Sequence, residues 1–364
     1  MLDAKLLREQ VRYNCLLAEA HHGGTLSVCG LVLRLRDHYK WEQGLPPWRE
    51  PEPSDLLDWI ETREARWEEI DSEGFTSLRI GSELLDPFQV ERINDVLVPE
   101  GLVYGAGYVA GLRPSFFLGT LREIQYLDDV RVLMVGKELA RDIFASPAMR
   151  QGSIIYARHH PMVSFLWEQI FERRPSARNA LHFALAQYGL DMEAVSADPN
   201  GHADRLYAIS EEQLATWVHH ELGEMRQSLF DNAMWREIVA SYANSAVEVY
   251  ARVLKDLAAD TDETGLLAHI TTARKAASLG FYVAFLRPFT KLLFPEILRA
   301  FRVFRQSRDW ATIAAARDRA RQRITRQIED LVRLHRQGES RGRPWAKRAI
   351  EEELIAPLGI LKRS

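Results

Sequence analysis

Apolar residues recur every three or four positions over most of this chain, and this spacing constrains the fold more than any other feature. The period is that of one face of an α-helix. It is clearest between residues 309 and 337, where a polar segment carries one apolar stripe of Ile313, Ala316, Ala320, Ile324, Ile328 and Leu331. Helical patterns dominate from Lys137 onward. The sequence therefore predicts a mostly α protein with a helical, bundle-like core.

The first 70 residues show the same period with two interruptions. Gly23-Gly24 divides residues 4–42 into two helices. Thr25 or Ser27 can cap the second helix, because a hydroxyl oxygen accepts hydrogen bonds from free helical N–H groups. Prolines between residues 46 and 53 then predict a loop, since proline denies a helix both an N–H and space. A third helix is expected to follow, up to about residue 70.

Between residues 75 and 136 the pattern changes to short runs of aromatic and β-branched residues. These runs are Leu102–Ala110, Ser115–Leu121 and Val130–Val135, and turn residues separate them. Runs of this kind predict a small antiparallel β-sheet near residues 100–136. The expected fold class is thus mostly α, of the α+β type.

The length of 364 residues is that of one large domain or two ordinary ones. The clearest turn near the middle is Ala197–Gly201, which contains Asp-Pro-Asn-Gly. We therefore expect a helical N-terminal region with a small β-sheet insertion over residues 1–200. A helical C-terminal region with basic helices is expected over residues 201–364.

The two cysteines, Cys15 and Cys29, form neither a CxxC motif nor a disulfide framework. Buried core thiols in a reducing compartment are the preferred interpretation, with pairing or metal binding as alternatives. The first residues carry charges and lack the apolar centre of a signal peptide. No run of about 18 uncharged apolar residues predicts a membrane helix. We therefore expect a cytoplasmic protein without an integral membrane segment.

Two near-motifs fail on their context. Gly105-Ala-Gly107-Tyr-Val-Ala110 resembles a dinucleotide-binding fingerprint, but such a loop must open a helix, and Pro114 follows shortly. Glycines of a tightly packed strand are the better interpretation, so no cofactor-binding residues are assigned. His220-Glu221-Leu-Gly-Glu224 has glutamate where the HExxH zinc motif requires a second histidine. A zinc protease of that class is not expected.

Pairs of histidine and carboxylate on helices carry the first functional hypothesis. Residues three or four apart on a helix point the same way, and pairs from several helices build di-metal sites. The chain has Glu19 with His22, His38 with Glu42, and His220 with Glu224. Random placement gives such pairs as often. Their apolar neighbours are the argument, because buried ionisable groups must be paired, hydrogen-bonded or metal-bound. Ordinary hydrogen-bonded histidines and surface ion pairs are the alternative.

The predicted metal ligands are Glu19, His22, His38, His220 and Glu224, with Glu42 and His160 as weaker candidates. Neutral imidazoles and carboxylates suit iron, manganese or zinc. A redox metal with an open coordination position can activate dioxygen or water. The first hypothesis is therefore a metal-dependent enzyme, an oxidoreductase.

A basic C-terminal segment carries the second hypothesis. Between Arg299 and Arg348 the chain has fifteen Lys and Arg residues against five Asp and Glu residues. Arginine binds phosphates and carboxylates as a planar fork, so the stripe Arg317–Arg326 fits nucleic acid. A membrane surface, a protein partner or a homo-oligomer are further alternatives, and a solvated or internally paired face is the preferred reading. This hypothesis describes a non-catalytic interaction or regulatory protein.

Several strings of residues also resemble an uncharacterised bacterial protein family. They are Tyr13-Asn-Cys15, Glu19-Ala-His21-His22-Gly, Cys29, Leu35-Arg-Asp-His-Tyr39-Lys-Trp41-Glu42, Pro46-Pro-Trp48, Arg113-Pro-Ser-Phe-Phe117 and His220-Glu-Leu-Gly-Glu224. The resemblance covers most of the chain. It implies a bacterial cytosolic protein, and it implies no chemistry and no site residues.

Overall fold

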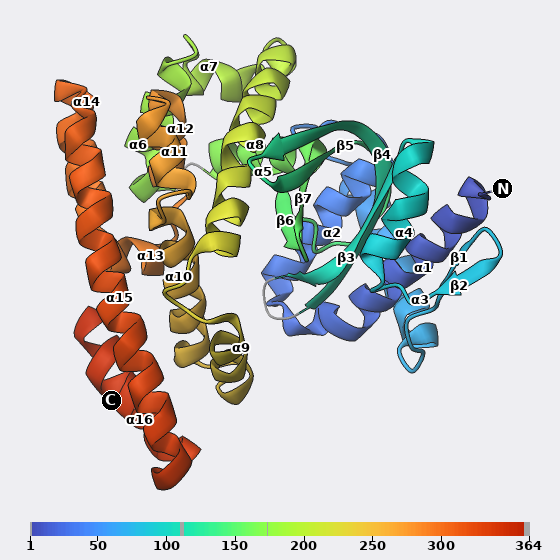
Figure 1. Ribbon diagram of the computed structural model, residues 1–364. Coiled ribbons are helices and arrows are strands. Elements are labelled where there is room, and N and C mark those ends of the chain that lie inside the picture. Colours follow the sequence, from blue (N-terminus) through green and yellow to red (C-terminus); the bar gives the residue numbers. More distant parts are fainter. Residues whose placement is uncertain (1, 110–112, 173, 360–364) are drawn as a thin grey trace. The chain divides into compact units, whose positions relative to one another are not determined.

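The computed structural model describes residues 2–109, 113–172 and 174–359, and its elements are drawn in Figure 1. The chain forms two compact units. Unit 1 comprises Met1–Phe171 and Pro199–Ala215, and unit 2 comprises Glu172–Asp198 and Thr216–Ser364. Helix α8 (Ala203–Arg226) contributes its first part to unit 1 and its second part to unit 2.

Unit 1 is built on a five-stranded sheet in the order β3-β4-β5-β7-β6. The strands are β3 (Leu102–Val109), β4 (Arg113–Leu127), β5 (Val130–Arg141), β6 (Ala148–Gln151) and β7 (Ile154–Arg158). β5 and β7 are parallel, and all other pairs are antiparallel. The edge strands β3 and β6 meet, because the Ala106 N–H donates to the Gln151 side-chain oxygen at 3.1 Å. The five-stranded sheet therefore nearly closes on itself.

Helices cover this sheet and complete unit 1. They are α1 (Ala4–His22), α2 (Val28–Glu42), α3 (Pro53–Ile70), α4 (Val90–Leu97) and α5 (His159–Glu172), beside a small hairpin of β1 (Leu78–Ile80) and β2 (Glu83–Leu85). α1 packs on β4 and β5, and α4 packs on β3. The Asn94 amide fixes α4 to the sheet, since it donates to the Tyr104 carbonyl at 2.7 Å and accepts from the Tyr104 N–H at 2.9 Å.

The predicted sheet is correct in its first three strands but too small, and the structure is mixed rather than antiparallel. The expectation of helices from Lys137 onward is wrong up to Arg158, where β6 and β7 complete the sheet. Every residue of β7 is buried, so the strand shows no alternation of apolar and polar residues. A short apolar run of this kind cannot be distinguished from a buried helix by its period.

The glycines of the sequence beginning at Gly105 were predicted to belong to a tightly packed strand, and this prediction is confirmed for the described residues 105–109. Gly105 lies in β3, and a Cβ atom there would come within 2.1 Å of the Phe117 ring on β4. Ala110 lies outside the described residues. Cys15 is a buried core thiol that donates to the Phe116 carbonyl at 3.3 Å, whereas Cys29 is exposed. The core interpretation is therefore confirmed for Cys15 and wrong for Cys29.

In its described residues unit 2 consists of helices and the turns that join them, without a strand. Besides the end of α8 it contains α6 (Pro175–Ala186), α7 (Met192–Ala197), α9 (Asn232–Ser241), α10 (Ala246–Thr261), α11 (Leu266–Thr272), α12 (Ala276–Phe285), α13 (Pro288–Leu293), α14 (Pro295–Ser307), α15 (Trp310–Arg341) and α16 (Arg343–Ile350). α6 packs on α12, and α10 packs on α9, α11 and α15. In the parts of the chain that are described, no helix is long and apolar enough to cross a membrane.

The helices predicted from periodicity are confirmed where the period is strongest. α1 and α2 flank the Gly23-Gly24 break, and the Ser27 hydroxyl accepts from the Gly30 N–H at 3.2 Å. The six apolar residues predicted to form the buried stripe of α15 are all buried. The α+β fold class is therefore correct, with a sheet larger than expected.

Candidate functional site

Two of the predicted ligands in unit 1, Glu19 and His38, are held by one arginine. The buried Glu19 carboxylate accepts hydrogen bonds from Arg63 Nε at 2.8 Å and Nη2 at 3.0 Å. The same Nη2 atom lies 3.0 Å from Nε2 of His38. A guanidinium has only donors, so His38 Nε2 must accept. Burial lowers the pKa of His38 against the opposing effect of Glu42, which leaves a neutral imidazole.

A second buried group of charges lies on the strands of unit 1. The Glu138 carboxylate accepts from Arg158 Nε at 2.6 Å and from Arg141 Nη1 at 3.1 Å. Burial opposes ionisation, but Arg158 and Arg141 hold the pKa of Glu138 below its ordinary value. Arg141 Nη1 also lies 3.1 Å from Nδ1 of His160, and burial together with Arg141 lowers the pKa of His160 to about 4. His160, like His38, is therefore a neutral hydrogen-bond acceptor.

The remaining predicted residues of unit 1 have local partners. Glu42 accepts from the Trp59 indole N–H at 2.9 Å and lies 3.4 Å from His38 Nε2. His22 ends α1, where its carbonyl accepts from the Thr25 hydroxyl at 2.6 Å. Burial and the neighbouring His21 lower the pKa of His22. The Glu42 carboxylate therefore has a hydrogen-bonding role, whereas the bond at His22 is made by its backbone carbonyl.

Unit 2 contains a chain of three polar side chains that ends on His220. The Tyr282 hydroxyl donates to Asp260 Oδ2 at 3.0 Å, and Asp260 Oδ1 lies 2.7 Å from Nδ1 of His220. Tyr282 and Asp260 are buried, whereas the His220 side chain keeps 22% of its surface exposed. Among the residues that the structure describes, none bonds Nε2 of His220. One ring nitrogen is therefore fixed, and the other is available.

The charges around His220 determine its protonation. Burial alone would lower the pKa of this imidazole, but the adjacent Asp260 carboxylate, with help from Glu221, outweighs that effect and raises the pKa well above the ordinary value. At neutral pH His220 is thus an imidazolium whose Nδ1–H donates to Asp260. A buried carboxylate that orients an imidazole in this way is the arrangement used for proton transfer in many enzymes.

Two glycines allow this contact. Gly223 lies one turn after His220 on α8, and a Cβ atom there would come within 2.3 Å of the Ala259 carbonyl oxygen on α10. A Cβ atom at Gly265 would come within 2.0 Å of the same oxygen. The backbone of α8 can therefore approach the end of α10 closely enough for His220 to reach Asp260, the residue after Ala259.

Glu224, the partner predicted for His220, lies one turn further along α8. Its carboxylate forms an ion pair with Lys255 Nζ at 2.5 Å, and the ammonium of Lys255 also lies over the Trp235 ring at 3.9 Å from the centroid. His220 and Glu224 thus have different partners on α10. Each of the two is neutralised by an opposite charge.

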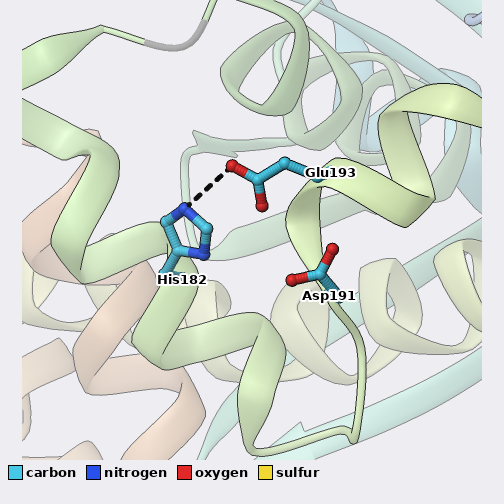
Figure 2. Close-up of side chains that lie close together, drawn as sticks. All are labelled: His182, Asp191 and Glu193. Carbon is cyan, nitrogen blue, oxygen red and sulfur yellow. Dashed lines mark ion pairs between the residues drawn. The ribbon is translucent and has the colours of Figure 1, made fainter.

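A trio of possible metal ligands lies elsewhere in unit 2. His182 comes from α6, Asp191 precedes α7, and Glu193 lies in its first turn, so that the three side chains face one another (Figure 2). One ligand atom from each lies within 4.8 Å of the others, and His182 Nε2 is 3.5 Å from Glu193 Oε1. Arg178 also pairs with that Glu193 oxygen, at 3.0 Å. Among the described residues, these three form a group of histidine and carboxylate side chains close enough to share one metal ion.

The five predicted ligands are divided between the two units. Glu19, His22 and His38 belong to unit 1, and His220 and Glu224 belong to unit 2. Within unit 1, Glu19 and His38 are brought together through Arg63. Metal binding by these five residues stays a prediction.

Sequence reasoning missed Asp260, Tyr282 and Arg63. Asp260 lies near the end of α10. It is forty positions from His220 along the chain. A sequence pattern reports neighbours on one helix and carries no signal for such a contact.

The arginines predicted to be solvated or internally paired include several with partners in unit 2. Arg321 pairs with Asp262 at 3.1 Å, and Arg323 pairs with Glu296. Arg308 lies over the Phe183 ring at 4.6 Å from the centroid. The internally paired reading is confirmed for Arg321 and Arg323.

Comparison with protein-family models finds two successive domains of one family in this chain. Residues 6–158 match the N-terminal domain of the family of unknown function DUF6866, and residues 163–353 match its C-terminal domain. Neither a curated protein nor a solved structure gave a significant match. The two domain matches follow each other along most of the sequence. The chain therefore belongs to the DUF6866 family.

Proposed function

We propose that this protein is an enzyme with an acid–base site in unit 2, in which His220 donates the proton. The observation that carries the proposal is the Tyr282–Asp260–His220 chain, with contacts of 3.0 and 2.7 Å. A histidine used only to link helices needs neither a second buried donor behind its carboxylate nor an available Nε2. Buried carboxylates of this kind hold the imidazole in one tautomer and stabilise its charged form.

The proposed roles follow from the charges. The His220 Nε2–H gives its proton to a leaving atom of the substrate, and the neutral Nε2 then takes a proton from water. Asp260 stays ionised and keeps Nδ1 protonated throughout. Tyr282 occupies the second carboxylate oxygen, so that Asp260 cannot rotate away from His220. The raised pKa makes His220 a proton donor at neutral pH, which is a general-acid role.

The proposal is tested with a panel of chromogenic esters, phosphomonoesters and glycosides, whose leaving groups all require a proton. His220→Gln should lower the rate of any reaction that the wild-type protein catalyses by about 10²- to 10⁴-fold. His202→Gln, which changes a histidine in the turn before α8, is the matched control and should keep the full rate. Equal rates for wild-type protein and His220→Gln would remove His220 from the chemistry. Absence of any turnover across the panel would count against the proposed leaving-group chemistry.

A second candidate function, metal binding, rests on a different observation. His182, Asp191 and Glu193 offer one nitrogen and two carboxylate oxygens, which is a donor set suited to zinc, manganese or iron with a position left for water. A metal would have to compete with Arg178 for Glu193. A metal at this site would be held by histidine and carboxylate ligands, as the sequence predicts. The ligands would be other residues than the five predicted ones.

Calorimetric titration of tag-free protein with Zn²⁺ and Mn²⁺ tests this candidate. One equivalent should bind to the wild-type protein, and His182→Ala should weaken binding at least tenfold. Arg178→Gln should strengthen it, because the competing cation is removed. Binding that is unchanged in His182→Ala would exclude the trio, and loss of binding in His220→Ala would instead support the ligand set predicted from the sequence.

A further inference from the structure

Asp256 is a further carboxylate beside the proposed acid–base site, and it lies on α10. It precedes Asp260 by one helical turn, and residues four apart on a helix point the same way, with Cβ atoms about 5–6 Å apart. Asp260 Oδ1 in turn lies 2.7 Å from Nδ1 of His220 on α8. Asp256 therefore lies on nearly the same side of α10 as Asp260, close to His220.

The charges of His220 and Asp256 act on each other. Against the effect of burial, Asp260 and more weakly Asp256 raise the pKa of His220. The surrounding protein partly desolvates the exposed Asp256 carboxylate and raises its pKa to about 6, and the His220 imidazolium opposes this rise. The like charges of Glu224 and Asp260 add to the rise. At pH 7 His220 is thus a cation that can lose a proton, and Asp256 is mostly an anion that can take one.

Asp256 is free to act on a ligand, whereas its two acidic neighbours are engaged. Asp260 accepts from the Tyr282 hydroxyl, and Glu224 pairs with Lys255. Within the described residues Asp256 forms neither an ion pair nor a hydrogen bond, and it is exposed to solvent. Its carboxylate oxygens can therefore reach a water molecule or a substrate.

We infer that Asp256 is the catalytic base of this site and works with His220 in a direct hydrolysis by water, an inference that rests on the proposed function of His220. Asp256 takes a proton from a water molecule while the water oxygen bonds to the electrophilic atom of the substrate. As the bond to the leaving oxygen breaks, the His220 Nε2–H gives its proton to that oxygen. Asp256 then releases its proton to solvent and His220 regains one from water, which restores the starting state.

The pH dependence of kcat/KM, for a substrate that the wild-type protein hydrolyses, tests the inference. The wild-type rate should rise with pH through about 6 as Asp256 ionises, and it should fall at alkaline pH as His220 loses its proton. Asp256→Asn should lower the rate by about 10²- to 10⁴-fold and remove the rise. Asp256→Glu returns a carboxylate and should recover part of both. Glu263→Gln, which changes an exposed carboxylate shortly after α10, is the matched control and should keep the full rate.

An NMR titration of the His220 ring signals gives a readout that needs no substrate. Asp256→Asn should lower the His220 pKa, because one of the carboxylates that stabilise the imidazolium is lost. Glu263→Gln should leave the His220 pKa unchanged. An unchanged His220 pKa in Asp256→Asn would overturn the inference, because the two side chains would then not act on each other.

The measured rates separate this inference from the proposed function. A full rate in Asp256→Asn together with a reduced rate in His220→Gln would overturn the base role of Asp256 and leave His220 as the acid. Full rates in both variants, or no turnover on any substrate of the panel, would overturn both. A burst of product that matches the amount of protein would indicate a covalent intermediate and overturn direct attack by water.

Discussion

Two histidines of unit 1, His38 and His160, and one histidine of unit 2, His220, lie against opposite charges. In unit 1, His38 and His160 lie against Arg63 and Arg141, and both imidazoles have lowered pKa values. In unit 2, His220 lies against Asp260, and its pKa is raised. An imidazole is therefore a neutral acceptor at His38 and His160 and a charged donor at His220. Only the second state supplies a proton at neutral pH, which is why the proposed chemistry is placed in unit 2.

The largest expected effect comes from removing the negative charge that balances the arginines of unit 1. Glu138→Gln leaves Arg141 and Arg158 buried without a counter-charge, and it should lower the free energy of unfolding by about 3–5 kcal/mol. Glu123→Gln on the exposed part of β4 is the control and should change the value by less than about 0.5 kcal/mol. Chemical denaturation measures both. A loss below about 1 kcal/mol for Glu138→Gln would show that the arginines are compensated elsewhere.

Acidification should next reveal the neutral state of His160. Its pKa is about 4 in the folded protein, against about 6.5 in an unfolded chain. As pH falls from 6.5 to 4, the unfolded chain takes up a proton that the folded protein does not, so the free energy of unfolding decreases by up to about 3 kcal/mol. His160→Gln keeps an acceptor for Arg141 and should remove this part of the decrease. Equal slopes for the variant and the wild-type protein would contradict a neutral His160.

Gly223→Ala tests whether the close approach of α8 to α10 in unit 2 is needed for the raised pKa of His220. The added Cβ would meet the Ala259 carbonyl at 2.3 Å, so α8 and α10 must separate. We expect a loss of about 1–3 kcal/mol in the free energy of unfolding, together with a lower His220 pKa because Asp260 moves away. Gly189→Ala would be a poor control because its φ is positive, whereas Gly24→Ala, with open space at its Cβ, is a suitable one. An unchanged His220 pKa in Gly223→Ala would show that the close packing of α8 on α10 is not required for the contact between His220 and Asp260.

The smallest effect is expected for Tyr282→Phe, which removes one hydrogen bond to Asp260. The free energy of unfolding should fall by about 1 kcal/mol, and the His220 pKa should rise, because the carboxylate loses a donor that shares its charge. Denaturation and proton NMR give the two values. A fall in the His220 pKa would contradict this prediction, since it would show that the lost positioning of Asp260 outweighs the gain in its negative charge.

The pH dependence of the His220 contact has the opposite sign to that of His160. Because the folded pKa of His220 lies above its unfolded value, the contact stabilises the protein fully below about pH 6.5. This stabilisation is lost as pH rises through the folded pKa. The difference in the free energy of unfolding between wild-type protein and His220→Gln should therefore shrink at alkaline pH.

Helices with a sustained period could be predicted from the sequence, and buried strands could not. α15 was predicted because one apolar stripe runs through a polar segment. β7 was missed because burial on both faces removes the alternation that marks a strand, and β5 pairs with it in parallel after an intervening strand. Parallel pairing depends on tertiary contacts that a local sequence pattern does not show. The predicted sheet therefore had only three strands.

The candidate site could be predicted only in part. His220 was selected for its place among apolar residues on a helix, but its partner Asp260 is set by the contact of α8 with α10. The sequence signal for that contact is Gly223, because a glycine inside a helical pattern can mark a close approach of another backbone. The arginine partners of Glu19 and His160 had no sequence signal, because a guanidinium reaches them from another element.

The protonation of His220 is measured most directly by an NMR pH titration of the histidine ring signals, assigned by comparison with His220→Gln. The account predicts a His220 pKa clearly above 6.5 in the wild-type protein and a pKa at or below 6.5 in Asp260→Asn, whose amide no longer stabilises the imidazolium. A wild-type pKa at or below 6.5, or a pKa that Asp260→Asn leaves unchanged, would contradict it.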